Sequence, residues 1–150
     1  MKKFRFKFSV LLEFRRRLES QALVVFSEKQ KIYQGELQNK INLQNELQMT
    51  LEKREKLGIQ PISAIEFRWH NEYIQGLKQK LIQSDQVILR THRELDKALR
   101  RYLDTRKRTK TIELLEEKER GEFHKEISKK NQKELDELII TKYQNREEAL

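Results

Sequence analysis

Side chains that could carry out catalysis are sparse in this sequence. Its three histidines, His70, His92 and His124, lie far apart, and there is no cysteine, so the spacing that a protein metal site needs is missing. The four glycines are isolated from one another, so no glycine-rich loop can cradle a phosphate. The neighbouring carboxylates Glu116 and Glu117 are expected to lie on a solvated helix face. We therefore predict that the protein is not an enzyme and has no catalytic residue, cofactor, metal ion or small-molecule substrate.

Positive charge, by contrast, is concentrated in two segments. Residues 1–17 hold seven Lys or Arg residues against one acidic residue, and residues 90–110 hold nine against three, in a chain of net charge +9. Such segments attract acidic partners, whether protein, nucleic acid or a lipid surface. They can also be ordinary solvated helix surface. An acidic protein is our preferred functional interpretation.

Two other partners are considered for this charge. A basic coiled-coil arm that binds nucleic acid is the main alternative, but single strands need aromatic side chains for stacking. Only Phe4, Phe6, Phe8 and Phe14 lie among the basic residues of the N-terminal segment. A basic helix lying on a membrane is less favoured, because the apolar stripe is expected to be occupied by a partner helix.

A further candidate is a short row of apolar side chains after the only proline. Trp69, Tyr73 and Leu77 follow one another at four-residue steps, which places them on one side of a helix. They can close the end of a helical hairpin, or they can bind a partner, since Trp and Tyr dominate binding energy where they are exposed. Both interpretations stay open.

The composition favours long helices over a packed sheet. The chain has 150 residues, enough for one domain; 38% are charged, 36% are hydrophobic, and one is a proline. That apolar fraction suits a narrow seam between two helices better than a thick core. No segment approaches the roughly 18 uninterrupted apolar residues of a membrane span. We therefore expect a soluble cytoplasmic protein.

A bend is predicted near residues 58–63. Pro61 lacks a backbone N–H and disfavours helix at the residue before it. Gly58 can end the preceding helix in the left-handed conformation, and Ser63, three residues before Glu66, can cap the following one. The sequence thus predicts an all-α fold, two long helices in an antiparallel coiled-coil hairpin. Its single domain would consist of a helix over about 9–57, a loop over 58–62 and a helix over about 63–146.

The second helix carries the clearer seam. Twelve of its positions, at alternating three- and four-residue steps, contain no charged residue, which is the a/d pattern of a coiled coil. These positions are Ile74, Leu77, Leu81, Ser84, Ile88, Thr91, Leu95, Ala98, Tyr102, Thr105, Thr109 and Ile112.

The first helix shows two apolar registers. One has a seven-residue step and consists of Leu11, Leu18, Val25 and Ile32. The other consists of Leu23, Phe26, Tyr33, Leu37, Leu47 and Leu51. A stutter of four residues near Ala22 to Phe26 would reconcile them.

The lengths of the two helices set the expected pairing. If the bend centres near residue 60, position i of the first helix faces about 120 − i of the second. The first helix then finds partners only as far as about Thr111, and the rest of the second helix overhangs. The same pairing brings the two basic segments together at the end away from the bend. Residues 1–8 are expected to form an extended lead-in.

The N-terminal run FRFKFSVLLEFRRRLESQA resembles the opening of the FliJ family, small coiled-coil proteins of the bacterial flagellar type III export apparatus. The matching positions are Phe4, Phe6, Phe8, Val10, Leu11, Arg15, Glu19 and Ala22. Residues 112–116 and 135–137 are similar to the C-terminal helix of that family. The injectisome counterparts of the family are close to it.

Membership would imply a non-enzymatic stalk with several partners: the hexameric export ATPase, the cytoplasmic linker of the export gate membrane protein, and export chaperones. The protein would lie in the cytoplasm, at the inner face of the cell membrane at the flagellar base. By this resemblance the gate-contacting face includes Trp69, Tyr73, Leu77 and Ser84, interrupted by Lys80. The residues expected to bind the ATPase ring are Arg15, Arg16, Arg17, Arg100, Arg101 and Arg106.

Overall fold

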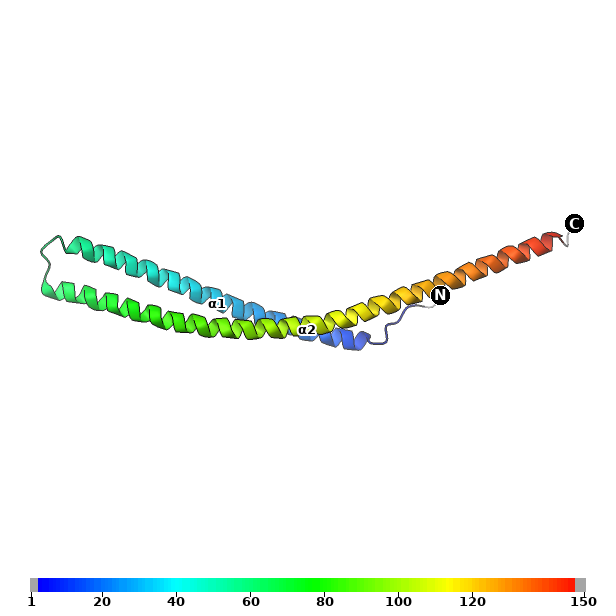
Figure 1. The fold of residues 1–150 in the computed structure, drawn as a ribbon, viewed down its shortest axis with the longest axis horizontal. Helices are drawn as coiled ribbons and strands as arrows, with labels where there is room; N and C mark the ends of the chain where they lie inside the picture. The colour runs from blue at the N-terminus through cyan, green and yellow to red at the C-terminus, as the bar shows by residue number, and fades with distance from the viewer. Residues whose placement is uncertain (1–2, 148–150) are drawn as a thin grey trace. The chain divides into compact units, whose positions relative to one another are not determined.

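Two long helices make up most of the protein in a computed structural model that describes residues 3–147 (Figure 1). Helix α1 spans Ser9–Leu57 and helix α2 spans Ala64–Glu147, and the described residues contain no strand. The helices pack antiparallel on either side of residues 58–63, so the predicted all-α hairpin and its bend are confirmed. Lys2, which belongs to the first basic segment, lies outside the described residues.

The chain divides into two compact units. The terminal unit comprises Met1–Glu19 and Thr105–Leu150, and the bend unit comprises Ser20–Asp104. The expectation of a single domain stays a prediction, and each unit is described by itself below.

The start of α2 is capped as its sequence indicates. The hydroxyl Oγ of Ser63 accepts a hydrogen bond from the backbone N–H of Glu66 at 3.2 Å, and the carbonyl of Ser63 accepts one from Phe67 at 3.2 Å. The bond from Glu66 satisfies one of the backbone donors that the first turn of a helix leaves without partners, and the bond from Phe67 is the first regular bond of the helix. The direction of α2 at the bend is therefore fixed locally, by Ser63.

The end of α1 differs from the prediction. No described glycine has a positive φ, so Gly58 does not take the left-handed conformation. Its N–H instead donates to the carbonyl of Arg54 at 2.9 Å, and the N–H groups of Ile59 and Gln60 donate to carbonyls three residues back. The helix thus ends by tightening into right-handed turns, which satisfy the last carbonyls without a left-handed cap.

The seam of α2 is confirmed at every predicted position. All twelve side chains are buried or half-buried, while most of their neighbours are exposed. Ile74, Leu77 and Thr109 are only 1% exposed. Uncharged residues occupy these positions because they face the other helix and not water.

The seam of α1 does not contain the predicted stutter. Fourteen buried and half-buried residues follow one unbroken alternation of three- and four-residue steps from the start of the helix to its end, and Leu18, Ser27, Leu37 and Leu51 beside them are also half-buried. The fourteen are Leu12, Arg15, Glu19, Ala22, Phe26, Lys29, Tyr33, Glu36, Lys40, Leu43, Leu47, Thr50, Arg54 and Leu57. Six of these fourteen are charged, so the seam does not stand out as an apolar pattern in the sequence. Of the predicted seven-residue register, Leu11, Val25 and Ile32 lie outside the seam at 40%, 42% and 50% exposed, whereas Leu18 is half-buried. In the second predicted register Leu23 is 43% exposed, and the other five residues are half-buried.

Contacts across the bend unit also correct the predicted pairing. The rings of Phe26 and Tyr102 stack with centroids 6.1 Å apart, and Lys40 Nζ lies 2.6 Å from a carboxylate oxygen of Asp85. The residue numbers of these two pairs add to 128 and 125, where the sequence predicted 120. The predicted pairing holds within one residue for Glu46 and Tyr73 of the same unit, whose side chains are hydrogen-bonded, and is offset for these two pairs.

In the terminal unit, residues 3–8 form an N-terminal strap that lies along α2, without regular secondary structure over residues 3–6 and with a turn at residues 7–8 (Figure 1). The ring of Phe4 contacts that of Phe123 with centroids 5.5 Å apart, and Phe6 is buried. Pairing therefore reaches Phe123 and does not stop near Thr111 as predicted. From residue 128 to 147 every side chain of α2 is exposed, so the overhang is real but begins later.

Candidate partner-binding surfaces

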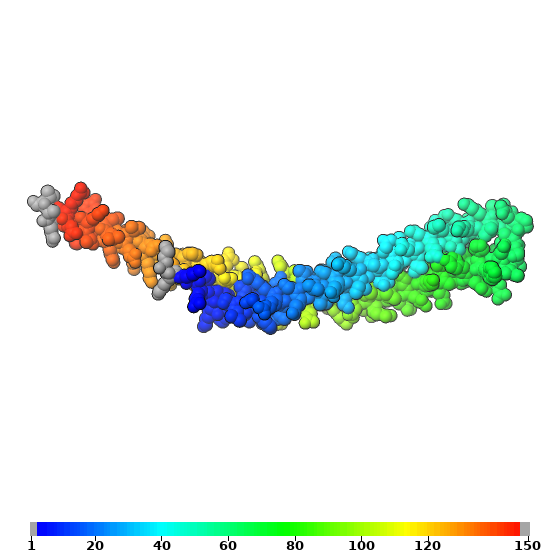
Figure 2. Space-filling view, turned by 180° about the vertical axis from the view of Figure 1, so that it is seen from behind, coloured from blue at the N-terminus to red at the C-terminus, as the bar shows by residue number. Residues whose placement is uncertain are grey.

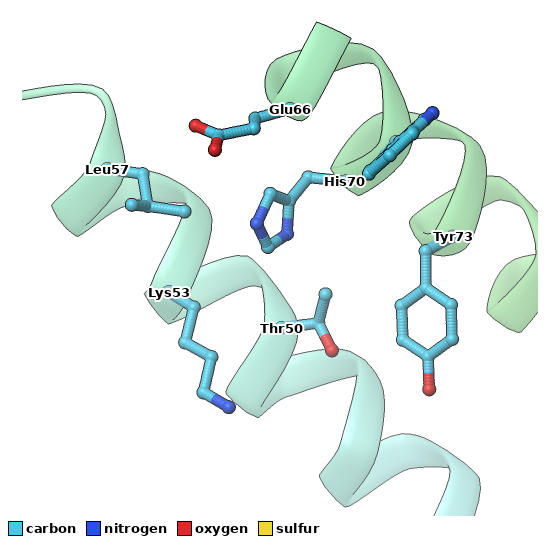
Figure 3. Close-up of a pocket in the computed structure, with 7 residues that line it drawn as sticks. Thr50, Lys53, Leu57, Glu66, His70 and Tyr73 are labelled. Atoms are coloured by element: carbon cyan, nitrogen blue, oxygen red, sulfur yellow. The ribbon is translucent and has the colours of Figure 1, made fainter. Parts of the chain in front are cut away.

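A groove lies beside the bend, between the last turns of α1 and the first turns of α2 (Figure 3). We call it the bend groove. Thr50, Lys53 and Leu57 of α1 lie on one side of it, and the side chains of Glu66, His70 and Tyr73 of α2 face them across it. Trp69 completes the lining. All seven residues belong to the bend unit.

Large aromatic side chains flank this groove without closing it. Trp69 is 66% exposed and Tyr73 is 49% exposed. Rings that sealed the end of the hairpin would be largely buried, so the exposed fractions favour the partner-binding interpretation over the plug.

A hydrogen bond holds one of the two rings in place. The hydroxyl of Tyr73 donates to the carboxylate of Glu46 on α1. This bond raises the pKa of Tyr73 above its usual value, and burial and the negative charge of Glu46 act in the same direction. Sequence reasoning did not single out Glu46, but the facing rule placed residue 47 opposite Tyr73 and so could have found it.

The other two residues assigned to the gate-contacting face, Leu77 and Ser84, lie between the two helices. Leu77 is 1% exposed and Ser84 is 8% exposed, because both belong to the seam with α1. The exposed residue between them, Lys80, is the one that interrupts the expected face. A partner can therefore reach Trp69 and Tyr73 on the paired hairpin, but it cannot reach Leu77 or Ser84 without separating the helices.

Four of the six arginines assigned to the ATPase ring lie in the terminal unit. Arg106 pairs with Glu19 at 3.0 Å, Arg16 pairs with Glu113 at 3.4 Å, and both bonds cross between the helices. Arg17 is exposed and pairs with Glu13 one turn earlier at 2.7 Å.

Arg15 differs from the other three because it is a seam residue. Its atom Nε is buried and has no hydrogen-bond partner. Its aliphatic stem thus packs between the helices in place of an apolar side chain.

The remaining two, Arg100 and Arg101, are exposed and belong to the bend unit. They lie on α2 beside the seam residue Tyr102. The structure also bears on the nucleic-acid alternative, because Phe4 is engaged with Phe123 and Phe6 is buried. Two of the four phenylalanines needed to stack on bases are thereby occupied within the protein.

Two other kinds of site were sought in the described residues. Within 3–147 no three His, Asp or Glu side chains are arranged to hold a metal ion. None of the helical stretches there is both long and apolar enough to cross a membrane.

Comparison with known proteins gives a family match along nearly the whole chain. Residues 4–148 match the family described as flagellar FliJ protein. No curated protein sequence matches. Among solved structures, CT670 from Chlamydia trachomatis, a proposed YscO homologue, is similar in fold, with a TM-score of 0.53 and 17% identity. The match covers 99% of this chain and 100% of that one.

Proposed function

This chain belongs to the FliJ family of flagellar proteins, and from that membership we propose that it is a non-enzymatic stalk of the type III export apparatus. In this role it binds the hexameric export ATPase and the cytoplasmic linker of the export gate, and it assists the delivery of chaperones and their substrates. Its place is the cytoplasm, at the inner face of the membrane at the flagellar base. The observation that carries the proposal is the extent of the match, since residues 4–148 include both helices and the bend.

Contact with the ATPase ring is supported by basic side chains that remain outside the seam. Arg100 and Arg101 are exposed, and the chain carries a net charge of +9. Exposed charges of this kind steer association with an acidic surface and weaken with salt. Arg15 contributes less directly, because its stem belongs to the seam.

The test is a ring-assembly assay with purified export ATPase. Hexamer formation and the cooperativity of ATP hydrolysis are measured with no added protein, with the full chain, and with an Arg100→Ser/Arg101→Ser variant. The matched control is Lys129→Ser/Lys130→Ser, which removes the same charge from the exposed overhang. We expect the full chain and the control to promote assembly, and the arginine variant to require several times more protein. Cooperativity that does not respond to the full chain contradicts the proposal.

Contact with the gate linker is supported by the bend groove. Trp69 and Tyr73 offer large apolar area beside it, and such residues dominate the energy of protein interfaces. A pull-down with the gate linker compares the wild type with Trp69→Ala/Tyr73→Ala. The control is Leu89→Ala/Leu103→Ala, since these two side chains are 54% and 52% exposed on the same helix. Selective loss with the aromatic variant supports the contact, and equal loss with both variants contradicts it.

A further inference from the structure

The first turns of α1 present an apolar face to solvent. Val10 is 78% exposed, Leu11 is 40% exposed and Phe14 is 52% exposed. Their spacing places them on one side of the helix, away from the seam residues Leu12 and Arg15. The first turns of α1, which carry this outer face, belong to the terminal unit and are coloured dark blue in Figure 2.

The sequence disfavoured a membrane-bound helix because the partner helix was expected to cover the apolar stripe. In the first turns of α1 the structure does not meet that expectation. The partner helix instead packs on the register of Leu12, Arg15 and Glu19, in which two residues of three are charged. The more apolar side of these turns, with Val10 and Phe14, is therefore left uncovered within the chain.

Cationic side chains frame this face on its N-terminal side. In the strap, Phe4 is half-buried and Phe6 is buried, whereas Lys3, Arg5 and Lys7 are exposed. Over residues 3–6 this alternation is that of an extended chain, in which successive side chains point in opposite directions, and Lys7 follows in a turn. Contact of Phe4 with Phe123 of α2 and burial of Phe6 thus leave all three cations exposed, in the residues that lead into α1.

An apolar helix face bordered by lysine and arginine suits the surface of an anionic lipid bilayer. At a bilayer interface, apolar side chains enter the boundary of the acyl chains while basic side chains meet anionic headgroups. We propose that the outer face of Val10, Leu11 and Phe14, together with Lys3, Arg5 and Lys7, binds an anionic lipid bilayer surface. Charge complementarity selects this occupant, since three cations flank the apolar residues.

The expected strength is modest and depends on lipid charge. Each basic residue near an anionic bilayer increases the partition coefficient by roughly fivefold, and part of this gain is lost with added salt. Burial of a valine and a phenylalanine side chain contributes a further factor of about ten or more. Binding should therefore be reversible and should need both the apolar and the cationic residues.

The experiment is co-sedimentation of the full chain with vesicles. One set contains phosphatidylcholine alone and the other contains phosphatidylcholine with about a third phosphatidylglycerol. The variants are Val10→Gln/Phe14→Gln, which removes apolar area, and Lys3→Gln/Arg5→Gln/Lys7→Gln, which removes charge. The matched control is Leu89→Gln/Leu103→Gln, which changes two side chains of similar exposure in the bend unit. Circular dichroism of each variant establishes that the helices are retained.

We expect the wild type and the control to bind anionic vesicles, and each variant of the terminal unit to bind at least about tenfold more weakly. Equal binding to both kinds of vesicle, or equal binding by all variants, overturns the proposal. So does a chain that remains in the supernatant with every vesicle. That last result would leave the outcome of the ATPase assay above unaffected.

Discussion

The hydroxyl of Tyr73 on α2 donates a hydrogen bond to the carboxylate of Glu46 on α1, and this bond ties an exposed aromatic ring to the neighbouring helix. It spans the two sides of the hairpin next to the bend groove. The ring that a partner would meet is thus held in one orientation before binding, which reduces the entropy lost on association.

Replacement of Glu46 by alanine should lower the pKa of Tyr73. The pKa is raised by the hydrogen bond to Glu46, then by burial and by the carboxylate charge. Because the folded state holds this proton more tightly than the unfolded state, the bond stabilises the fold at pH values below 10.0 and is lost as pH rises through the raised pKa. Tyrosinate ultraviolet absorbance, taken as the difference from a Tyr73→Phe variant, measures the ionisation. An unchanged titration in Glu46→Ala would show that the bond does not form.

Gly58→Ala should leave the free energy of unfolding unchanged or raise it by up to about 1 kcal/mol. An added Cβ at Gly58 would meet the nearest carbonyl at 3.4 Å, an ordinary contact, and its φ is not positive. Urea denaturation gives the value, with Gly35→Ala as the control in a helix interior where nothing lies within 4 Å. A loss of about 1 kcal/mol at Gly58 alone would indicate the left-handed cap after all.

Lys40→Leu should stabilise the protein by about 1 kcal/mol. Lys40 occupies a seam position with its side chain 32% exposed, and its partner Asp85 is 59% exposed. The ion pair is therefore worth little in water, while a leucine would fill the seam, and Asp85 would stay solvated. Lys31→Leu, at an exposed position of the same helix, should change the free energy of unfolding by less than about 0.5 kcal/mol. Equal effects of the two substitutions would contradict the position of the seam.

Leu77→Ala should cost about 2–5 kcal/mol of folding free energy, because it leaves a cavity at a side chain that is 1% exposed. Leu135→Ala, at a side chain that is 59% exposed in the overhang, should fall within about 0.5 kcal/mol of the wild type. Thermal or urea unfolding of both variants makes the comparison. A mild effect of Leu77→Ala would mean that the seam is open there and that this residue is available to a partner.

The sequence predicted the structure correctly where a single physical rule determined it. Pro61 and Ser63 determine the bend through backbone chemistry alone, and Ser63 caps α2 as expected. The seam of α2 was legible because its twelve positions carry no charge. The FliJ resemblance rested mainly on the N-terminal run, and the family match over residues 4–148 confirms it.

The sequence was misleading about the seam of α1, where long polar side chains serve as seam residues. Arg15, Lys29 and Lys40 bury their stems between the helices. A search for apolar periodicity therefore found only part of the seam, in the register of Phe26 and Tyr33, and joined it by a stutter to a second register that includes the exposed Leu11. The same limitation affected the gate-contacting face. Leu77 and Ser84 were assigned both to the seam and to this face, and the structure shows that the other helix covers them, at 1% and 8% exposed.

The antiparallel register has a consequence for the order in which the chain folds. Arg54 and Asn71, bonded at 3.1 Å near the bend, are separated by 17 residues, whereas Arg16 and Glu113 are separated by 97. Because the entropy lost on loop closure grows with loop length, the contacts near the bend should form first, and pairing should then proceed towards the chain ends. Pulse-labelled hydrogen exchange during refolding can follow this order, since backbone amides beside Arg54 should be protected before those beside Arg16. Protection that began at the chain ends would mean that the hairpin closes in the opposite direction.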